Sequence, residues 1–134
     1  MAFECGALAR SGGRSHAVAL EELLGHLEAE DADVSRGEIK VGEGWSATRL
    51  RIRRPGEAEL EQYLQVSVGG EILEIYLEDA AAVLAPEALR GRDLMLTTTL
   101  SGTTDPVVND RIMAYVLEEW DGVPWDETSG FALP

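Results

Sequence analysis

Hydrophobic residues recur along this chain at two spacings, and the first spacing is that of a helix. Four leucines follow the i, i+3, i+4, i+7 spacing of a single helix face: Leu20, Leu23, Leu24 and Leu27. Glutamates occupy the opposite side, and Ser15 precedes the run as a suitable N-cap. The pattern predicts an amphipathic helix over 16–30.

From residue 38 to residue 77 the spacing changes to alternation, which is typical of half-buried strands. Short turns containing Gly or Pro divide this stretch into four expected strands: 38–42, 45–54, 58–68 and 71–77. A two-residue turn at Gly69-Gly70 would make a hairpin. That register pairs Val66 with Leu73 and Leu64 with Ile75 on one face, and it sets Tyr63 beside Tyr76 on the other.

The three-residue loop at 55–57 sets a second register, which can be tested against charge. It pairs Ile52 with Leu60 on the apolar face. On the polar face it places two arginines opposite glutamates and one opposite a tyrosine. The pairs are Arg53 with Glu59, Arg51 with Glu61, and Arg49 with Tyr63. Since opposite charges facing each other stabilise a sheet, the two turns together predict an antiparallel meander over 38–77.

The rest of the chain predicts shorter elements and a last helix. The Ala-rich stretch 78–91 indicates one or two helical turns, with Asp79 as a possible cap and Pro86 at a first helical position. Alternation predicts a strand over 94–100. Asp105-Pro106 is typical of a helix start, and that helix is expected to end near Trp120 before Gly122. The tail, with Trp125 and Phe131, can fold back on the domain.

These elements predict a single α+β domain over 1–134. Its antiparallel sheet of about five strands, formed by the meander 38–77 and the strand 94–100, packs on N-terminal and C-terminal helices. The opposite face is expected to be open or partly covered by the middle helix. Residues 1–14 are small and Gly-rich without clear periodicity, so they are interpreted as a flexible lead-in.

The net negative charge of the chain limits the kinds of partner that it can be expected to bind. The chain has 25 acidic and 11 basic residues, a net charge of −14, and only the stretch 44–58 is positive. Such a field disfavours direct binding to nucleic acid or to an anionic membrane, and it favours a basic partner. A single cysteine and the lack of a long apolar run predict a cytoplasmic protein.

Catalytic signatures are missing from the sequence. Cys5 has no neighbouring His or basic residue that would activate a thiolate. His26 shares a helix face with Glu22 and Glu30, but no Cys or second His is placed to complete a zinc site. No phosphate-binding loop is present. We therefore expect no enzymatic activity, cofactor or metal.

Two groups of residues are candidate binding patches. The first surrounds the end of the last helix, where tryptophans could anchor a basic partner while acids steer it, or could simply pin the helix end. It comprises Glu118, Glu119, Trp120, Asp121, Trp125, Asp126 and Glu127. The second is an arginine ladder with tyrosines beside it, either a recognition patch or a face neutralised by Glu59 and Glu61. It comprises Arg49, Arg51, Arg53, Tyr63 and Tyr76.

Together these features predict a non-enzymatic protein that binds and neutralises, or chaperones, a basic protein partner. Immunity proteins, anti-CRISPR-type inhibitors and secretion chaperones often have this size, acidity and order of elements, although no residue motif links the chain to one of them. One alternative is a small enzyme or ligand-binding domain that uses clustered carboxylates. Another is a structural subunit that self-associates, as a homodimer, through the open face of the sheet.

Overall fold

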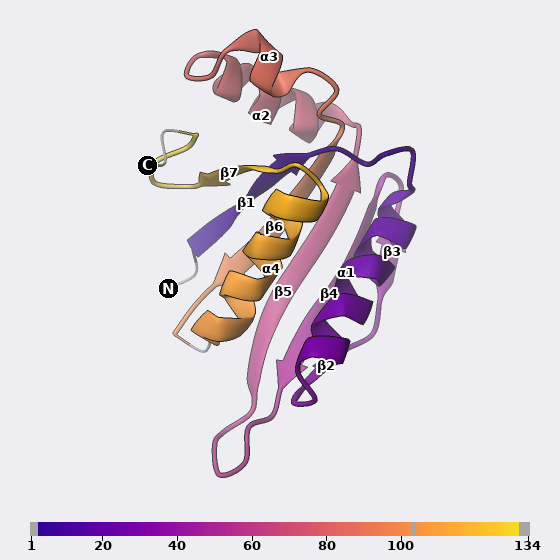
Figure 1. Cartoon of the computed structure of the whole chain (residues 1–134), viewed down its shortest axis with the longest axis vertical. Coiled ribbons are helices and arrows are strands. Elements are labelled where there is room, and N and C mark those ends of the chain that lie inside the picture. Colours follow the sequence, from indigo (N-terminus) through magenta and orange to yellow (C-terminus); the bar gives the residue numbers. More distant parts are fainter. Residues whose placement is uncertain (1–2, 103, 132–134) are drawn as a thin grey trace.

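The computed structural model describes residues 3–102 and 104–131, and within them four helices and seven strands form an α+β fold (Figure 1). The strands are β1 (Phe3–Ala9), β2 (Val34–Arg36), β3 (Lys40–Gly42), β4 (Trp45–Ile52), β5 (Leu60–Val68), β6 (Leu94–Leu100) and β7 (Val123–Asp126). The helices are α1 (His16–Glu30), α2 (Glu71–Ala81), α3 (Pro86–Leu89) and α4 (Pro106–Glu119).

All strand pairs are antiparallel, and the spatial order is β2-β4-β5-β6-β1-β7, with β3 pairing the same edge of β4 as β2. The strand predicted over 94–100 is confirmed as β6, and it lies between β5 and β1. The sheet has seven strands where about five were expected, because β1, β2 and β7 join it while residues 71–77 do not.

The β4–β5 hairpin confirms the predicted register. Ile52 pairs with Leu60, Arg51 with Glu61, and Arg49 with Tyr63. Beyond the paired residues, Arg53 and Glu59 form an ion pair. Ile52 and Leu64 are fully buried, so the apolar face of this hairpin is the core face.

The prediction of a strand over 71–77 is wrong, because these residues form α2. Leu73, Leu77 and Ala80 recur at helical spacing and turn inward, whereas Ile75 is exposed. Gly69 and Gly70 both have positive φ, and they turn the chain off the sheet into the helix. The expected pairs of Val66 with Leu73, Leu64 with Ile75 and Tyr63 with Tyr76 do not form. Instead, β5 pairs with β6, so that Val66 faces Leu96 and Leu64 faces Thr98.

The interpretation of residues 1–14 as a flexible lead-in is also wrong for the described part, because Phe3–Ala9 is a strand between β6 and β7. Ala7, Leu8 and Ala9 are completely buried. Because this strand is covered on both faces, its sequence does not alternate between apolar and polar residues, and it shows no strand periodicity. Residues 1 and 2 lie outside the described residues.

The predicted ends of both long helices are confirmed. The Ser15 side chain accepts a hydrogen bond from the Val18 N–H, and Asp105 accepts from Val107 and Val108. Gly122 donates its N–H to Val116 O at the end of α4. In the middle region α3 begins at Pro86 as predicted. Asp79, expected as a cap, instead lies inside α2.

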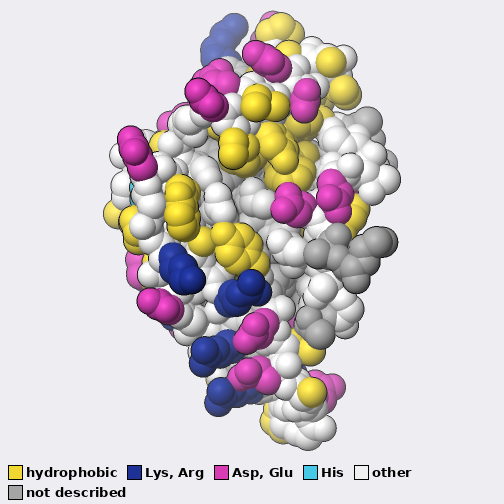
Figure 2. Space-filling view, turned by 180° about the vertical axis from the view of Figure 1, so that it is seen from behind, with side chains coloured by type: hydrophobic (Ala, Val, Ile, Leu, Met, Phe, Trp, Pro, Cys, Tyr) yellow, Lys and Arg dark blue, Asp and Glu magenta, His cyan; other side chains and the backbone are white. Residues whose placement is uncertain are grey.

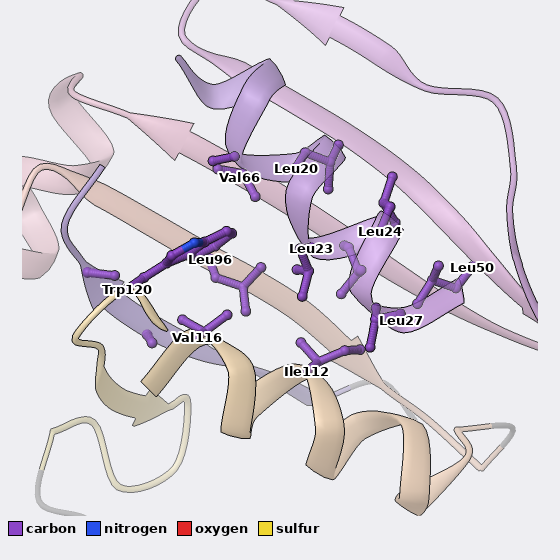
Figure 3. Packing of buried hydrophobic residues seen from close by; sticks show 14 of the residues in the cluster. Leu20, Leu23, Leu24, Leu27, Leu50, Val66, Leu96, Ile112, Val116 and Trp120 are labelled. Carbon is purple, nitrogen blue, oxygen red and sulfur yellow. The ribbon is translucent and has the colours of Figure 1, made fainter. Parts of the chain in front are cut away.

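The main core lies between one face of the sheet and the layer formed by α1 and α4 (Figure 3). Burying a Leu or Val side chain contributes about 1.5–3 kcal/mol, so this layer supplies most of the stabilisation. Its labelled members are Leu20, Leu23, Leu24, Leu27, Leu50, Val66, Leu96, Ile112, Val116 and Trp120.

The opposite face of the sheet is only partly covered. A smaller core joins α2, α3 and the C-terminal segment to the β1 and β6 end of this face, where Leu8 and Met95 are buried. The folding back of the tail is thereby confirmed, since Trp125 and Phe131 belong to this core. On β4 and β5 the same face carries Arg49, Arg51 and Glu61, which are exposed. The open part of the sheet is therefore the β4–β5 part.

Candidate functional site

A hollow of about 400 Å³ lies on the open part of the sheet, and its lining includes basic, aromatic and acidic side chains. We call it the cationic groove and define it by Lys40, Trp45, Arg49, Arg51 and Tyr63. The remaining lining residues are Gly37, Glu38, Ala47, Thr48 and Glu61.

Alternation along β4 builds this groove. Trp45, Ala47, Arg49 and Arg51 point away from the helices, while Leu50 and Ile52 between them enter the core. Ala47 is small, so it leaves depth between the indole on one side and the guanidinium groups on the other.

Backbone contacts hold the walls of the groove in place. The Trp45 indole lies across Gly42, its pairing partner in β3, where a Cβ atom would collide with the ring. At the neighbouring edge the Gly37 N–H donates to Arg49 O at 2.9 Å, and Thr48 Oγ1 donates to Glu38 O at 3.1 Å. The fold itself therefore sets the position of the aromatic wall.

Tyr63 lines the groove from β5. The Arg49 guanidinium carbon lies 5.7 Å from the centre of its ring, a cation–π contact. Its hydroxyl donates to Gln65 Oε1 at 2.7 Å. Burial raises the pKa of the Tyr63 phenol, and the opposing effect of Arg49 is smaller. The ring is therefore neutral at pH 7.

The three cations of this groove form no ion pair with any residue that the structure describes. Seven of the 11 basic residues form ion pairs. Within residues 3–102 and 104–131, the basic residues that form none are Lys40, Arg49, Arg51 and Arg90. Figure 2 shows Lys and Arg side chains gathered at the lower left of this face, beside hydrophobic side chains. Three of the four cations without an ion pair therefore lie together in the groove.

The second candidate patch is therefore brought together only in part. Arg49, Arg51 and Tyr63 converge as predicted, whereas Arg53 pairs with Glu59 outside the groove. Tyr76 belongs to α2 and packs against Trp125, with ring centres 4.8 Å apart and the rings tilted by 58°. Sequence reasoning missed Lys40 and Trp45. The alternation through 45–51 could have placed Trp45, but the position of Lys40 depends on the pairing of β3 with β4.

The structure divides the first candidate patch between the two faces of the sheet. Trp120 is 1% exposed in the main core, and Trp125 is 2% exposed in the smaller core. Neither indole is available as a surface anchor, so both pin the chain. Asp121 accepts from Arg10 at 2.9 Å and lies 3.3 Å from Arg92; together these cations lower the pKa of its carboxyl.

The other carboxylates of that patch also separate. Glu118 and Glu119 line a hollow of about 280 Å³ between α1 and α4, next to His26 and Tyr115. Asp126 accepts from the backbone of its own turn, and Glu127 accepts from the Glu4 N–H. The seven residues therefore do not form one surface, although their role in binding stays a prediction.

A different acidic surface joins α2 to β7. We call it the acid–apolar surface, and it comprises Glu71, Ile72, Glu74, Ile75, Glu78, Asp79, Asp126 and Glu127. Tyr76, Trp125 and Phe131 form the aromatic wall of a hollow of about 270 Å³ between the two segments. Burial raises the pKa of the Tyr76 phenol, and Glu4, Asp79 and Glu127 raise it further, so negative charge converges here.

The remaining titratable candidates have structural roles. His26 packs on Tyr115, with ring centres 4.7 Å apart, and Glu22 pairs with Arg14. In the described part of the chain, no three His, Cys, Asp or Glu side chains gather in a metal-binding arrangement.

Cys5 is expected to be chemically inert in the folded protein. Burial, with a smaller contribution from Asp126, raises the pKa of its thiol to about 11, so little thiolate is present near pH 8. Iodoacetamide at about pH 8 should leave Cys5 unmodified in native protein and modify it fully in urea, as measured by intact mass. Rapid modification of the native protein would contradict the buried position.

None of the helices in the described ranges is both long and apolar enough to cross a membrane. Comparison of the chain with protein-family models, with curated proteins and with solved structures gives no match.

Proposed function

We propose that this protein is a non-enzymatic binding protein that occupies and neutralises, or chaperones, a basic protein partner. Immunity proteins, anti-CRISPR-type inhibitors and secretion chaperones act in this way. The observation that supports the proposal is the acid–apolar surface, where Ile72 and Ile75 are 63% and 55% exposed among carboxylates. A cytoplasmic location, where a lone thiol stays reduced, belongs to the same proposal.

The composition of α2 supports a role outside the fold. Glu71 and Glu74 in the first turn are favourable beside the positive end of the helix dipole. Glu78 and Asp79 lie in the last turns, where the dipole disfavours negative charge by about 0.3–1 kcal/mol each. Neither carboxylate forms an ion pair with any described residue. Their position costs stability, which fits carboxylates that meet a partner's cations.

The exposed isoleucines support the same surface. Ile72 and Ile75 lie at i and i+3 on the outer face of α2, where they are exposed and are not buried in the smaller core. An apolar centre surrounded by charged groups is the usual arrangement of a protein interface. Since the charged residues of the acid–apolar surface are all acidic, the surface is complementary to a basic partner with an apolar patch.

The negative electrostatic field of the whole chain also favours a basic partner. Eight of the 25 carboxylates form ion pairs within the described residues, which leaves 17 without one. Such a field accelerates the approach of a basic protein and loses strength over about 8–10 Å at physiological salt. Association should therefore slow as salt rises.

The test is affinity capture from the cell of origin, followed by kinetics with the purified partner. Neutralising α2 with Glu71→Gln, Glu74→Gln and Glu78→Gln should lower the association rate about tenfold at low salt. Ile72→Ala with Ile75→Ala should mainly raise the dissociation rate.

The matched control neutralises three exposed acids that belong to neither acidic patch, Glu30→Gln, Glu57→Gln and Asp110→Asn, with the same change of net charge. It should change the association rate by less than about twofold. Equal losses from both triple variants would show that only net charge matters. Loss of binding from neutralising Arg49 and Arg51 alone would assign the partner to the cationic groove instead.

A further inference from the structure

We propose that the cationic groove binds a small planar anion, namely an aromatic ring that carries a phosphate or a carboxylate group. The groove lies on β3, β4 and β5, whereas the acid–apolar surface lies on α2 and β7, and the two have opposite charge. This second site goes beyond binding to a basic protein and does not depend on it.

The dimensions of the groove suit a small molecule. Its volume of about 400 Å³ lies in the range of small-molecule sites, about 300–1,000 Å³. Ala47 forms the floor, and the Trp45 indole, held across Gly42, forms a rigid wall. A planar ring entering beside this wall would find an aromatic face already in place, so little ordering would be needed on binding.

The charges of the groove point to an anion. Lys40, Arg49 and Arg51 form no ion pair with described residues, although Glu38 and Glu61 line the same hollow. Arg51 even faces Glu61 in the β4–β5 register without forming an ion pair with it. Although the chain has a large excess of carboxylates, the guanidinium groups of Arg49 and Arg51 form no ion pair, so their N–H donors can bind a ligand. Their fork of N–H groups matches the oxygens of a phosphate or a carboxylate.

The aromatic residues specify a planar ligand. Trp45 is half-buried, and Tyr63 directs its hydroxyl to Gln65, so its hydrogen-bonding group is already satisfied. Rings of this kind stack on nucleobases and on other planar groups. The negative field of the whole chain repels a nucleic-acid polymer far more than a molecule with one or two charges. The ligand class is therefore small, planar and anionic.

The direct test is titration of the purified full chain, followed by amide-resolved NMR and calorimetry. The probes are adenosine monophosphate and indole carboxylate, with adenosine and indole as uncharged counterparts. At least one anion should saturate the protein and shift the resonances of Lys40, Trp45, Arg49, Arg51 and Tyr63. Its uncharged counterpart should bind about tenfold more weakly, and the tighter anion identifies phosphate or carboxylate as the recognised group.

Matched variants separate the groove from net charge. Arg49→Gln with Arg51→Gln should weaken binding of the tighter anion about tenfold. Arg53→Gln with Arg90→Gln makes the same charge change outside the groove and should weaken it less than about twofold. Trp45→Leu should weaken the aromatic anions but not inorganic phosphate. Unchanged resonances in α4 would verify that each variant is folded.

Three results would overturn the proposal. The first is the absence of saturation by both anions up to about 10 mM, a concentration at which even weak specific sites fill. The second is an equal loss of affinity in the two double-arginine variants. The third is tighter binding of a single-stranded oligothymidylate than of either small anion, which would assign the groove to nucleic acid.

Discussion

Gly6→Ala is expected to lower the free energy of unfolding by about 3 kcal/mol or more. Gly6 lies in β1 between β6 and β7, and a Cβ atom there would collide with the carbonyl of Leu96 and touch the Trp125 ring. Because the first obstacle is backbone, side-chain rearrangement cannot relieve it. Urea unfolding followed by circular dichroism measures the loss.

Gly25→Ala is the matched control for this substitution. Gly25 lies within α1, and a Cβ atom there meets nothing within 4 Å. Alanine at this position should raise the free energy of unfolding by about 0.5–1 kcal/mol. Similar effects from the two substitutions would show that β1 does not occupy the crowded position between β6 and β7.

Asp31→Asn is expected to lower the free energy of unfolding by about 2–3 kcal/mol. The Asp31 side chain is only 10% exposed, and its carboxylate lies 2.7 Å from Arg54 and 3.1 Å from Arg111. These contacts tie the end of α1 to the β4–β5 hairpin and to α4. Asp110→Asn, on the exposed side of α4, should change stability by less than about 0.5 kcal/mol.

This cluster also predicts a dependence on pH. Burial alone would raise the pKa of Asp31, but hydrogen bonds from the Asp33 N–H and from Arg54, with the charges of Arg54 and Arg111, outweigh it and lower the pKa. A lowered folded-state pKa stabilises the protein above the unfolded value, near pH 4, and this contribution is lost as the pH falls. The stability difference between wild type and Asp31→Asn should therefore narrow between about pH 6 and pH 2. A constant difference would exclude the ionised carboxylate as its cause.

Periodicity identified the elements that have one buried and one solvated side. The leucines of α1 and the β4–β5 register follow from such contrast, whereas the ends of α4 follow from residue types that favour helix termini. Periodicity failed for β1, where small residues are buried on both faces. It also failed for α2, since a short apolar segment after two glycines fits a hairpin as well as a helix. Only the pairing of β5 with β6 decides between these alternatives, and that contact is distant in sequence.

The candidate sites could likewise be predicted where they depend on local alternation, but not where they depend on how the chain turns between elements. Alternation within one hairpin was enough to bring Arg49, Arg51 and Tyr63 to one face. Residues 118–127 are adjacent in sequence, yet the chain turns from α4 into β7 within them, so Trp120 and Trp125 lie on opposite faces of the sheet. Proximity along the chain is therefore a poor guide where a helix passes into a strand.

The position of β1 also determines when the protein can fold during its synthesis. This strand is synthesised before its neighbours β6 and β7, which begin at Leu94 and Val123. At a translation rate of about 5–20 residues per second, β1 waits roughly 5–20 s for β6. During that interval the nascent chain holds an apolar strand with both edges unpaired, the kind of segment that chaperones bind. The sheet is therefore completed only after β7 has been synthesised, because β7 pairs with the free edge of β1.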